Sequence, residues 1–425
     1  MHALHFGAGY FGLGFACALL AQANVPVVLL NRRSNESTKD DLDTVSRSRR
    51  NELLMERGAY FVNHRDMVDP SLSDFQRVEL EAVLLYDARN AHDFANTLSE
   101  YDDDLVVTFA LRRIENYETA LKIVAQIFQS RAERNCRSKI FLMACENGVQ
   151  SSQVKAEFQR YVAPDAIDSS QVIFLQTSVD RICTRLTSLT IHRSEWLVVE
   201  AEEHAHWYID DVGGIETLRR ALSSLGHKVT FSKYVAQERM KKLAIVNGAH
   251  ALVALHCWYL GIKNTDEFLN GTAFFDRSGT PAAFESVERR RDFLGALIHE
   301  LLEGARLFIS REPDARQFCE RYMSDSECHR IASELVDRLS RTPDSVARII
   351  KNFVRPEPAD KIHERHIEFF RSVRARIEEP VLAYIQNRGF GPPTICQVLV
   401  EILDLLGRVD QFRNMPLFTT TSGLH

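Results

Sequence analysis

Several features that mark other protein classes are absent from this chain of 425 residues. The eight cysteines are scattered without a Cys-x-x-Cys pair, which argues against a disulfide framework and favours free thiols in a reducing cytoplasm. No apolar run is long enough to span a bilayer, and residues 1–6 lack the leader of a signal peptide. The net charge of −6 gives no reason to expect affinity for nucleic acid or anionic membranes. We therefore expect a cytoplasmic protein without nucleic-acid or membrane partners.

A glycine-rich turn lies near the start of the chain. Residues 3–6 form a predicted apolar strand, and a helix over 15–23 and a second apolar strand over 25–30 follow the turn. This order is typical of a dinucleotide-binding unit, whose three glycines make a tight turn, admit a pyrophosphate and pack helix against strand. The N-terminus of the helix then faces the phosphates. The sequence therefore predicts an NAD(P) site built by Gly7, Gly9, Tyr10, Phe11 and Gly12.

No carboxylate stands at the end of the second predicted strand, where NAD-preferring sites usually hold the ribose hydroxyls with Asp or Glu. Asn31, Arg32 and Arg33 stand there instead. Because guanidinium groups pair well with phosphate, this substitution favours NADP(H). The alternative is a solvated loop with incidental arginines. Thr108, at the end of a further buried strand over 105–109, is expected near the nicotinamide.

From about residue 218 the chain is predicted to be almost wholly helical, with one strand over 228–232. One apolar, Ala-rich helix is expected over 236–261. At ~100° per residue, its Lys242, His250 and Asn247 fall at roughly 0°, 80° and 140°. Because buried polar groups are costly without partners, these three indicate either a site or a helix end with capping and solvated residues. Lys241, ~100° round from Lys242, is expected to tolerate alanine.

The spacing Lys242-x4-Asn247-x2-His250 resembles the signature of the mannitol dehydrogenase family, the zinc-independent long-chain polyol dehydrogenases. The resemblance implies that Lys242 is the general base and that Asn247 and His250 bind the reacting oxygen. Glu146-Asn147, after a predicted strand over 140–144, is also similar to the family and implies that Asn147 donates to the substrate oxygen. A helix cap is a second, compatible interpretation of Asn147.

Two further elements resemble the family with differences. Arg338 begins an element similar to one that lines the polyol site in the family, which implies that Arg338 contacts the substrate, although Arg341 stands where Asn is usual. Asp180, in Val-Asp-Arg-Ile, either shapes the site or forms a structural ion pair with Arg181. Residues 110–111 are Ala-Leu, where the family usually has a turn resembling Gly-Pro.

A metal site is not expected. Glu203, His204 and His206 lie close together in the sequence, but no second cluster at metal-ligand spacing accompanies them. The resembled family needs no metal. The sequence therefore predicts catalysis without zinc.

Together these features predict an α/β architecture with a Rossmann-type doubly wound sheet over 1–210 and a mostly helical substrate domain over 211–425. The resemblance implies an NAD(P)-dependent oxidoreductase that interconverts a secondary alcohol of a polyol, polyol phosphate or sugar acid with its ketose. The alternatives are a hydroxyacid-type dehydrogenase on a similar plan and a catalytically silent dinucleotide-sensing protein. The expected partner is a small polyol or ketose, and the expected state is a monomer or small homo-oligomer.

Overall fold

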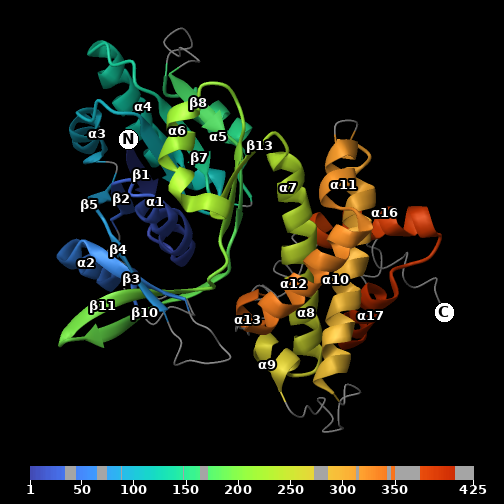
Figure 1. The fold of residues 1–425 in the computed structure, drawn as a ribbon. Coiled ribbons are helices and arrows are strands. Elements are labelled where there is room, and N and C mark those ends of the chain that lie inside the picture. Colours follow the sequence, from blue (N-terminus) through green and yellow to red (C-terminus); the bar gives the residue numbers. More distant parts are fainter. Residues whose placement is uncertain are drawn as a thin grey trace. The chain divides into compact units, whose positions relative to one another are not determined.

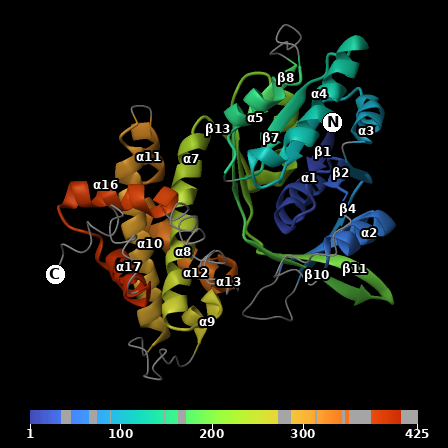
Figure 2. The ribbon, with the colours of Figure 1, turned by 180° about the vertical axis from the view of Figure 1, so that it is seen from behind.

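The computed structural model describes residues 1–33, 45–64, 74–87, 89–146, 148–162, 171–271, 286–312, 315–341, 346–349 and 374–406. The chain folds into two compact units, Met1–Ala236 and Gln237–His425, and Figures 1 and 2 show each from two sides. This division falls after the 210/211 boundary expected from the sequence. The strand β13 (Val229–Ser232) accounts for the difference, because it pairs with a strand of the first unit.

A parallel sheet of six strands is the centre of the first unit, in the order β5-β2-β1-β6-β7-β8. Its strands are β1 (His2–Phe6), β2 (Val27–Arg32), β5 (Ala82–Tyr86), β6 (Leu105–Phe109), β7 (Ile140–Ala144) and β8 (Val172–Leu175). Strand β1 pairs in parallel with β2 on one side and β6 on the other. This order confirms the predicted Rossmann-type sheet, and its switch point, where such folds bind ligands, lies beside β1.

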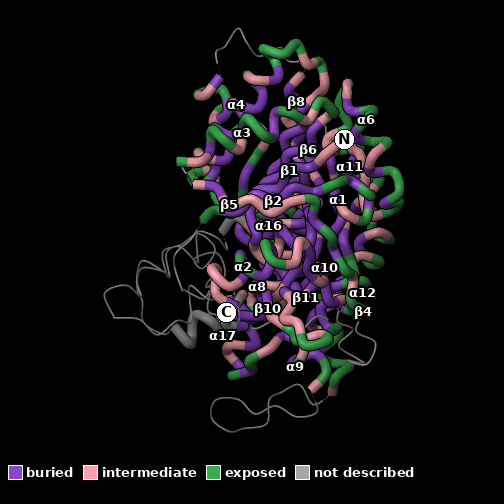
Figure 3. The backbone as a smooth tube through the Cα atoms, turned by 90° about the vertical axis from the view of Figure 1, so that its left-hand side faces the viewer, coloured by how far each residue is buried: buried purple, intermediate pink, exposed green. Residues whose placement is uncertain are grey.

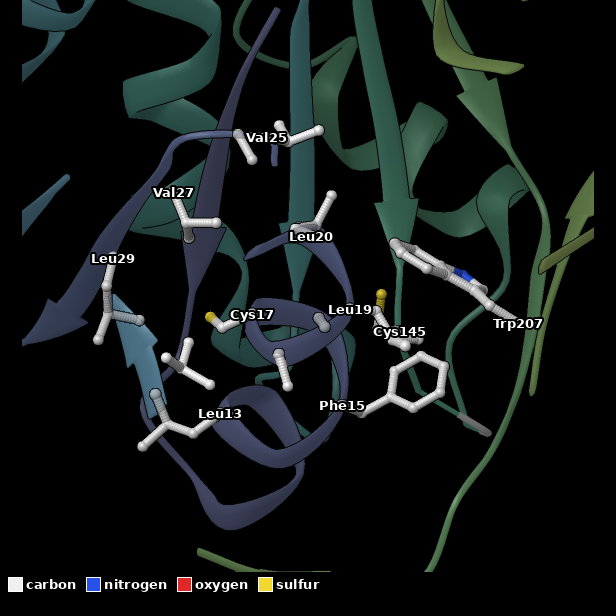
Figure 4. Packing of buried hydrophobic residues seen from close by; sticks show 14 of the residues in the cluster. Leu13, Phe15, Cys17, Leu19, Leu20, Val25, Val27, Leu29, Cys145 and Trp207 are labelled. Atoms are coloured by element: carbon white, nitrogen blue, oxygen red, sulfur yellow. The ribbon is translucent and has the colours of Figure 1, made fainter. Parts of the chain in front are cut away.

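Helices cover both faces of this sheet, which explains why its strands are apolar on both sides. Ala3 of β1 packs with one face and Leu4 and Phe6 with the other. The first face carries η1 (Gly12–Cys17), α1 (Ala18–Gln22) and α6 (Glu216–Ala221), and the second carries α3 (Ala91–Ser99), α4 (Glu118–Glu133) and α5 (Ser151–Phe158). Figure 3 shows the buried strands between them in purple. On the first face the ring of Phe15 meets Trp207 edge to face, with centroids 5.6 Å apart (Figure 4).

Two smaller sheets complete the first unit. One has the order β10-β11-β3-β4 and the other β13-β12-β9. Their strands are β3 (Ala59–His64), β4 (Asp74–Glu79), β9 (Thr177–Asp180), β10 (Cys183–Ile191), β11 (Ser194–Ala201), β12 (His206–Asp210) and β13. The remaining helical elements are α2 (Arg47–Arg57), η3 (Ile114–Asn116) and η5 (Ser223–Lys228).

The second unit is helical in all the parts that the structure describes. Its elements are α7 (Val235–Lys242), η6 (Leu243–Asn247), α8 (Gly248–Tyr259), α9 (Thr265–Asn270), α10 (Val287–Ile309), α11 (Arg316–Tyr322), α12 (Asp325–Arg341), α13 (Val346–Ile349), η8 (Arg374–Glu378), α16 (Glu379–Arg388) and α17 (Pro393–Leu406). Helix α10 packs against α8, α12, α16 and α17. It buries an apolar stripe at helical spacing, namely Leu294, Leu297, Ile298, Leu301 and Leu302. Among the described helices, none is long and apolar enough to cross a membrane.

Candidate active site

The glycine-rich turn follows β1 at the switch point of the parallel sheet. Gly7 has a φ of +114°, a conformation that L residues with side chains rarely adopt. A Cβ on Gly7 would also lie 2.6 Å from the backbone oxygen of Ala110, in the loop after β6. Gly7 is therefore required both by its own backbone and by the approach of the neighbouring loop.

The other two glycines of the turn have different surroundings. A Cβ on Gly9 would meet no atom of the described chain within 4 Å, whereas one on Gly12 would lie 2.4 Å from the Gly7 oxygen. The first helical hydrogen bond runs from the Leu13 N–H to the Gly9 carbonyl, so the preceding amides lie at a helix N-terminus. Open space beside Gly9, at the positive end of a helix, fits a pyrophosphate. Tyr10 and Phe11 are half-buried at this terminus.

The side chain of Asn31, at the end of β2, points toward the glycine-rich turn. Its Oδ1 accepts from the Ala8 N–H at 3.1 Å, and its Nδ2 donates to Asn51 Oδ1 at 2.6 Å. Only 9% of Asn31 is exposed. The residue therefore holds the glycine-rich turn to β2, and Asn51 of α2 fixes its amide, a role that the sequence did not indicate.

Arg32 and Arg33 are exposed beyond the end of β2. Arg33 Nε lies 3.9 Å from the carboxylate of Asp87, which follows the neighbouring strand β5. The backbone N–H groups of Arg89 and Asn90 donate to this carboxylate. These hydrogen bonds, of which the one from Arg89 has the larger effect, lower the pKa of Asp87 below its usual value. A carboxylate therefore does lie near the end of β2, but it comes from Asp87, the residue that follows β5.

Thr108 is fully buried, opposite His5 in the pairing of β6 with β1. Its Oγ1 lies 2.7 Å from His5 Nδ1, so its hydroxyl points into the sheet. Thr108 is thus adjacent to the turn, but its hydroxyl is already used within the protein.

The loop after β6 is fastened by Glu146, which follows β7. The Glu146 carboxylate accepts hydrogen bonds from the Leu111 N–H and, at 2.7 Å, from the Tyr117 hydroxyl. Burial raises the pKa of Glu146, and these hydrogen bonds oppose the rise. The Ala-Leu pair at 110–111 is thus held against Gly7 by a carboxylate. Asn147 lies outside the described residues.

Lys242, Asn247 and His250 lie on one helical run of the second unit, but the run is not a regular α-helix. Residues Leu243–Asn247 form the π-turn η6, in which the Gly248 N–H donates to the Leu243 carbonyl five residues earlier. A π-turn closes its hydrogen bond over five residues rather than four, so each residue rotates the chain by less than the ~100° of an α-helix. Asn247 is five residues from Lys242, so the π-turn brings their directions closer than the ~140° of the α-helical prediction. Isolated π-turns occur frequently at functional sites.

Lys242 and Lys241 have different surroundings. Lys242 is 9% exposed, and Asn247 and His250 are half-buried. Lys241 Nζ lies 2.7 Å from the buried carboxylate of Glu238 and 5.5 Å from the ring centroid of Phe318. The expectation that Lys241 tolerates alanine stays a prediction, and this ion pair is a reason against it, because alanine would remove this partner of Glu238.

The two residues expected to contact the substrate, Asp180 and Arg338, lie in different units. Asp180 ends β9 in the first unit, and its carboxylate lies 3.4 Å from His204 Nε2. Its neighbour Arg181 is buried and donates to the Gly14 and Glu202 carbonyls at 2.6 and 2.9 Å, which fastens the helix after the turn to the smaller sheets. Arg338 is half-buried on α12 of the second unit.

The histidines considered as metal ligands have other neighbours. His204 faces Asp180, while His206 Nε2 lies 2.9 Å from Thr230 Oγ1 and its ring stacks on Tyr208. Within the described ranges, no group of three or more His, Cys, Asp or Glu side chains is arranged to hold a metal ion.

Comparison with known proteins identifies several relatives. The mannitol-1-phosphate 5-dehydrogenase of Enterococcus faecalis is 25% identical over 366 residues, which cover 84% of this chain and 80% of that protein. The structure of a substrate-free D-sorbitol dehydrogenase is similar with a TM-score of 0.61 at 14% identity, covering 96% of this chain and 80% of that one. The ternary complex of Pseudomonas fluorescens mannitol 2-dehydrogenase with NAD and D-mannitol gives a TM-score of 0.59 at 14% identity, covering 95% and 78%.

At 14% identity the two solved structures show a common fold. The family itself is shown by a sequence model of the mannitol dehydrogenase Rossmann domain, which matches residues 1–219. This match extends from β1 into α6, so it includes the glycine-rich turn and the sheet that positions it. The chain belongs to the mannitol dehydrogenase family.

Proposed function

We propose that this protein is an NAD(P)-dependent oxidoreductase that interconverts a secondary alcohol of a polyol, polyol phosphate or sugar acid with the corresponding ketose. The observation that carries the proposal is the glycine-rich turn, with open space beside Gly9 at a helix N-terminus, in a member of this family. A curated relative is named for its action on mannitol 1-phosphate, which supports including polyol phosphates among the substrates.

The proposed chemistry assigns a separate task to each polar side chain. The nicotinamide, when bound, accepts or supplies the hydride. Lys242, as a neutral amine, accepts the hydroxyl proton during oxidation and returns it during reduction. Asn247 and Asn147 donate to the oxygen as negative charge develops on it, and His250 binds this oxygen or its neighbour. Arg338 is a proposed substrate contact, whereas the proximity of Asp180 to His204 favours a structural role for Asp180.

A panel of substrates tests the proposal. The purified protein is incubated with NAD⁺ or NADP⁺ and polyols, polyol phosphates, sugar acids or simple 2-hydroxyacids, and formation of the reduced nucleotide is followed by absorbance. Oxidation of a polyol-type substrate is expected. Turnover of simple 2-hydroxyacids alone would favour the hydroxyacid alternative, and nucleotide binding without any turnover would favour the sensing protein.

The arginines after β2 lead us to propose a preference for NADP(H). Replacing Arg32 and Arg33 with Gln should lower kcat/KM for NADPH about tenfold relative to NADH, because charged hydrogen bonds to the 2′-phosphate are lost. Asp87→Asn should act in the opposite direction, since it removes the carboxylate 3.9 Å from Arg33. Asn31 is left intact because it binds Ala8 and Asn51. A wild-type enzyme with the higher kcat/KM for NADH would refute this preference.

We also propose that turnover does not depend on a metal ion. If Lys242 exchanges the proton and the two Asn side chains stabilise the oxygen, no Lewis acid is needed. Activity should therefore be unchanged after exhaustive dialysis against a chelator. Loss of activity on chelation, with recovery on adding zinc, would contradict this assignment.

A further inference from the structure

His5 is a polar side chain in the middle of an apolar strand. It lies in β1, is fully buried and, like Ala3, points to the sheet face that carries η1 and α1. Its Nδ1 lies 2.7 Å from Thr108 Oγ1, and its Nε2 lies 3.0 Å from the Gly7 carbonyl oxygen. The ring therefore connects β6 to the first residue of the glycine-rich turn.

These two contacts fix the direction of both hydrogen bonds. The Gly7 carbonyl can only accept, so His5 Nε2 carries a proton and donates. Burial lowers the pKa of His5 to about 4, and the hydrogen bond to Gly7 opposes this effect. The ring is thus neutral at physiological pH, Nδ1 has a lone pair, and the Thr108 hydroxyl must donate to it.

The same ring also limits the space beneath the turn. A Cβ on Gly12 would lie 2.5 Å from His5 Nε2, so the imidazole occupies the position that a side chain at 12 would need. Gly7 and Gly12 are thus both in contact with His5, while the open space lies beside Gly9 between them in sequence.

We infer that His5 is a positioning residue of the dinucleotide site: its Nε2–H holds the Gly7 carbonyl, and thereby fixes the turn in the conformation that leaves the space beside Gly9 open for a pyrophosphate. This inference rests on the proposed function. His5 itself is buried and does not touch the nucleotide.

Two amide variants separate the two hydrogen bonds. His5→Gln places an amide N–H near the position of Nε2 and keeps a donor for Gly7, whereas His5→Asn is too short to reach Gly7 but keeps an acceptor for Thr108. We expect His5→Asn to raise the Kd for the preferred reduced nucleotide about tenfold, and His5→Gln to stay within about threefold of wild type. Fluorescence titration with NADH and with NADPH measures both, independently of turnover.

Leu4→Ala is the matched control, because Leu4 is the preceding residue of β1, is fully buried and packs on the opposite face. It should lower the melting temperature without changing Kd at temperatures well below unfolding. If His5→Asn bound the nucleotide as tightly as wild type, the inference would be overturned but the proposed function would not. The same would hold if Leu4→Ala, at equal stability, raised Kd as much as His5→Asn does. A wild-type protein that binds neither nucleotide would overturn the proposed function as well.

The ring tautomer provides a second measurement. In NMR spectra of protein labelled with ¹⁵N-histidine, the ring signals of His5 are those that disappear in His5→Gln. At neutral pH these signals should show a protonated Nε2 and an unprotonated Nδ1. A neutral ring with its proton on Nδ1 in wild type would overturn the inference, because Nε2 could not then donate to the Gly7 carbonyl.

Discussion

Lys242→Ala should lower turnover in both directions by about 10²–10⁴-fold, the usual scale for loss of a general acid–base group. The nucleotide Kd should change little, because the task proposed for Lys242 is proton exchange with the substrate hydroxyl and not nucleotide binding. Initial rates with saturating nucleotide, combined with fluorescence titration, measure the two effects separately. The oxidation rate of wild type should also rise with pH as the base loses its proton, and this dependence should disappear in the variant.

The control for this experiment is Lys241→Arg, which keeps a cation near Glu238. Alanine is unsuitable at 241, because Lys241 is 2.7 Å from the nearly buried Glu238 carboxylate. Comparable activity of Lys242→Ala and wild type, together with an inactive but folded Lys241→Arg, would mean that the proposed spacing starts at the wrong lysine. The roles proposed for Asn247 and His250 would then also be withdrawn.

Alanine at Gly9 and at Gly12 should give opposite patterns of stability and affinity. A Cβ at position 12 would lie 2.4 Å from the Gly7 oxygen and 2.5 Å from His5, so Gly12→Ala should destabilise the first unit by about 1–3 kcal/mol and weaken nucleotide binding. A Cβ at position 9 would enter open space, so Gly9→Ala should keep the melting temperature of wild type. Gly9→Ala should nevertheless raise the nucleotide Kd by about tenfold or more, because the methyl group enters the proposed pyrophosphate position.

Thermal unfolding and nucleotide titration of both variants test this contrast. Unchanged affinity of Gly9→Ala would show that the pyrophosphate does not approach this face of the turn. A Gly12→Ala protein as stable as wild type would show that His5 and the turn can move apart at little cost.

The sequence predicted the central sheet because local patterns determine it. Apolar strands buried on both faces, the glycine spacing and the helix after it are all properties of neighbouring residues. The domain boundary was less accessible: β13 is short and only partly buried, and its membership in the first unit depends on pairing with β12. Pairing of this kind is a tertiary property, and no local pattern encodes it.

Site residues could be predicted from the sequence only where the residue type itself points to a chemical role. The glycines and the Lys-Asn-His spacing have recognisable chemistry, but Asn31 was expected to face a nucleotide and instead binds Ala8 and Asn51. Asp87 was missed because it follows β5, far from β2 in the sequence. His5 did carry a signal, since a histidine within an apolar strand needs a buried partner.

The π-turn between Lys242 and Asn247 means that the number of residues in this motif carries as much information as their identity. In a regular α-helix, the same five-residue separation would direct the two side chains ~140° apart. The extra residue acts as a retained insertion, and the α-helices on either side keep their own hydrophobic faces. A relative that lacks one residue within 243–247 and has a regular α-helix there would hold its Asn four residues from the lysine, only ~40° round the helix, so the two side chains would still share a face. An alignment that places a gap at this length difference would therefore pair residues that share a direction, whereas an alignment without the gap would pair each later residue of the helix with one ~100° away.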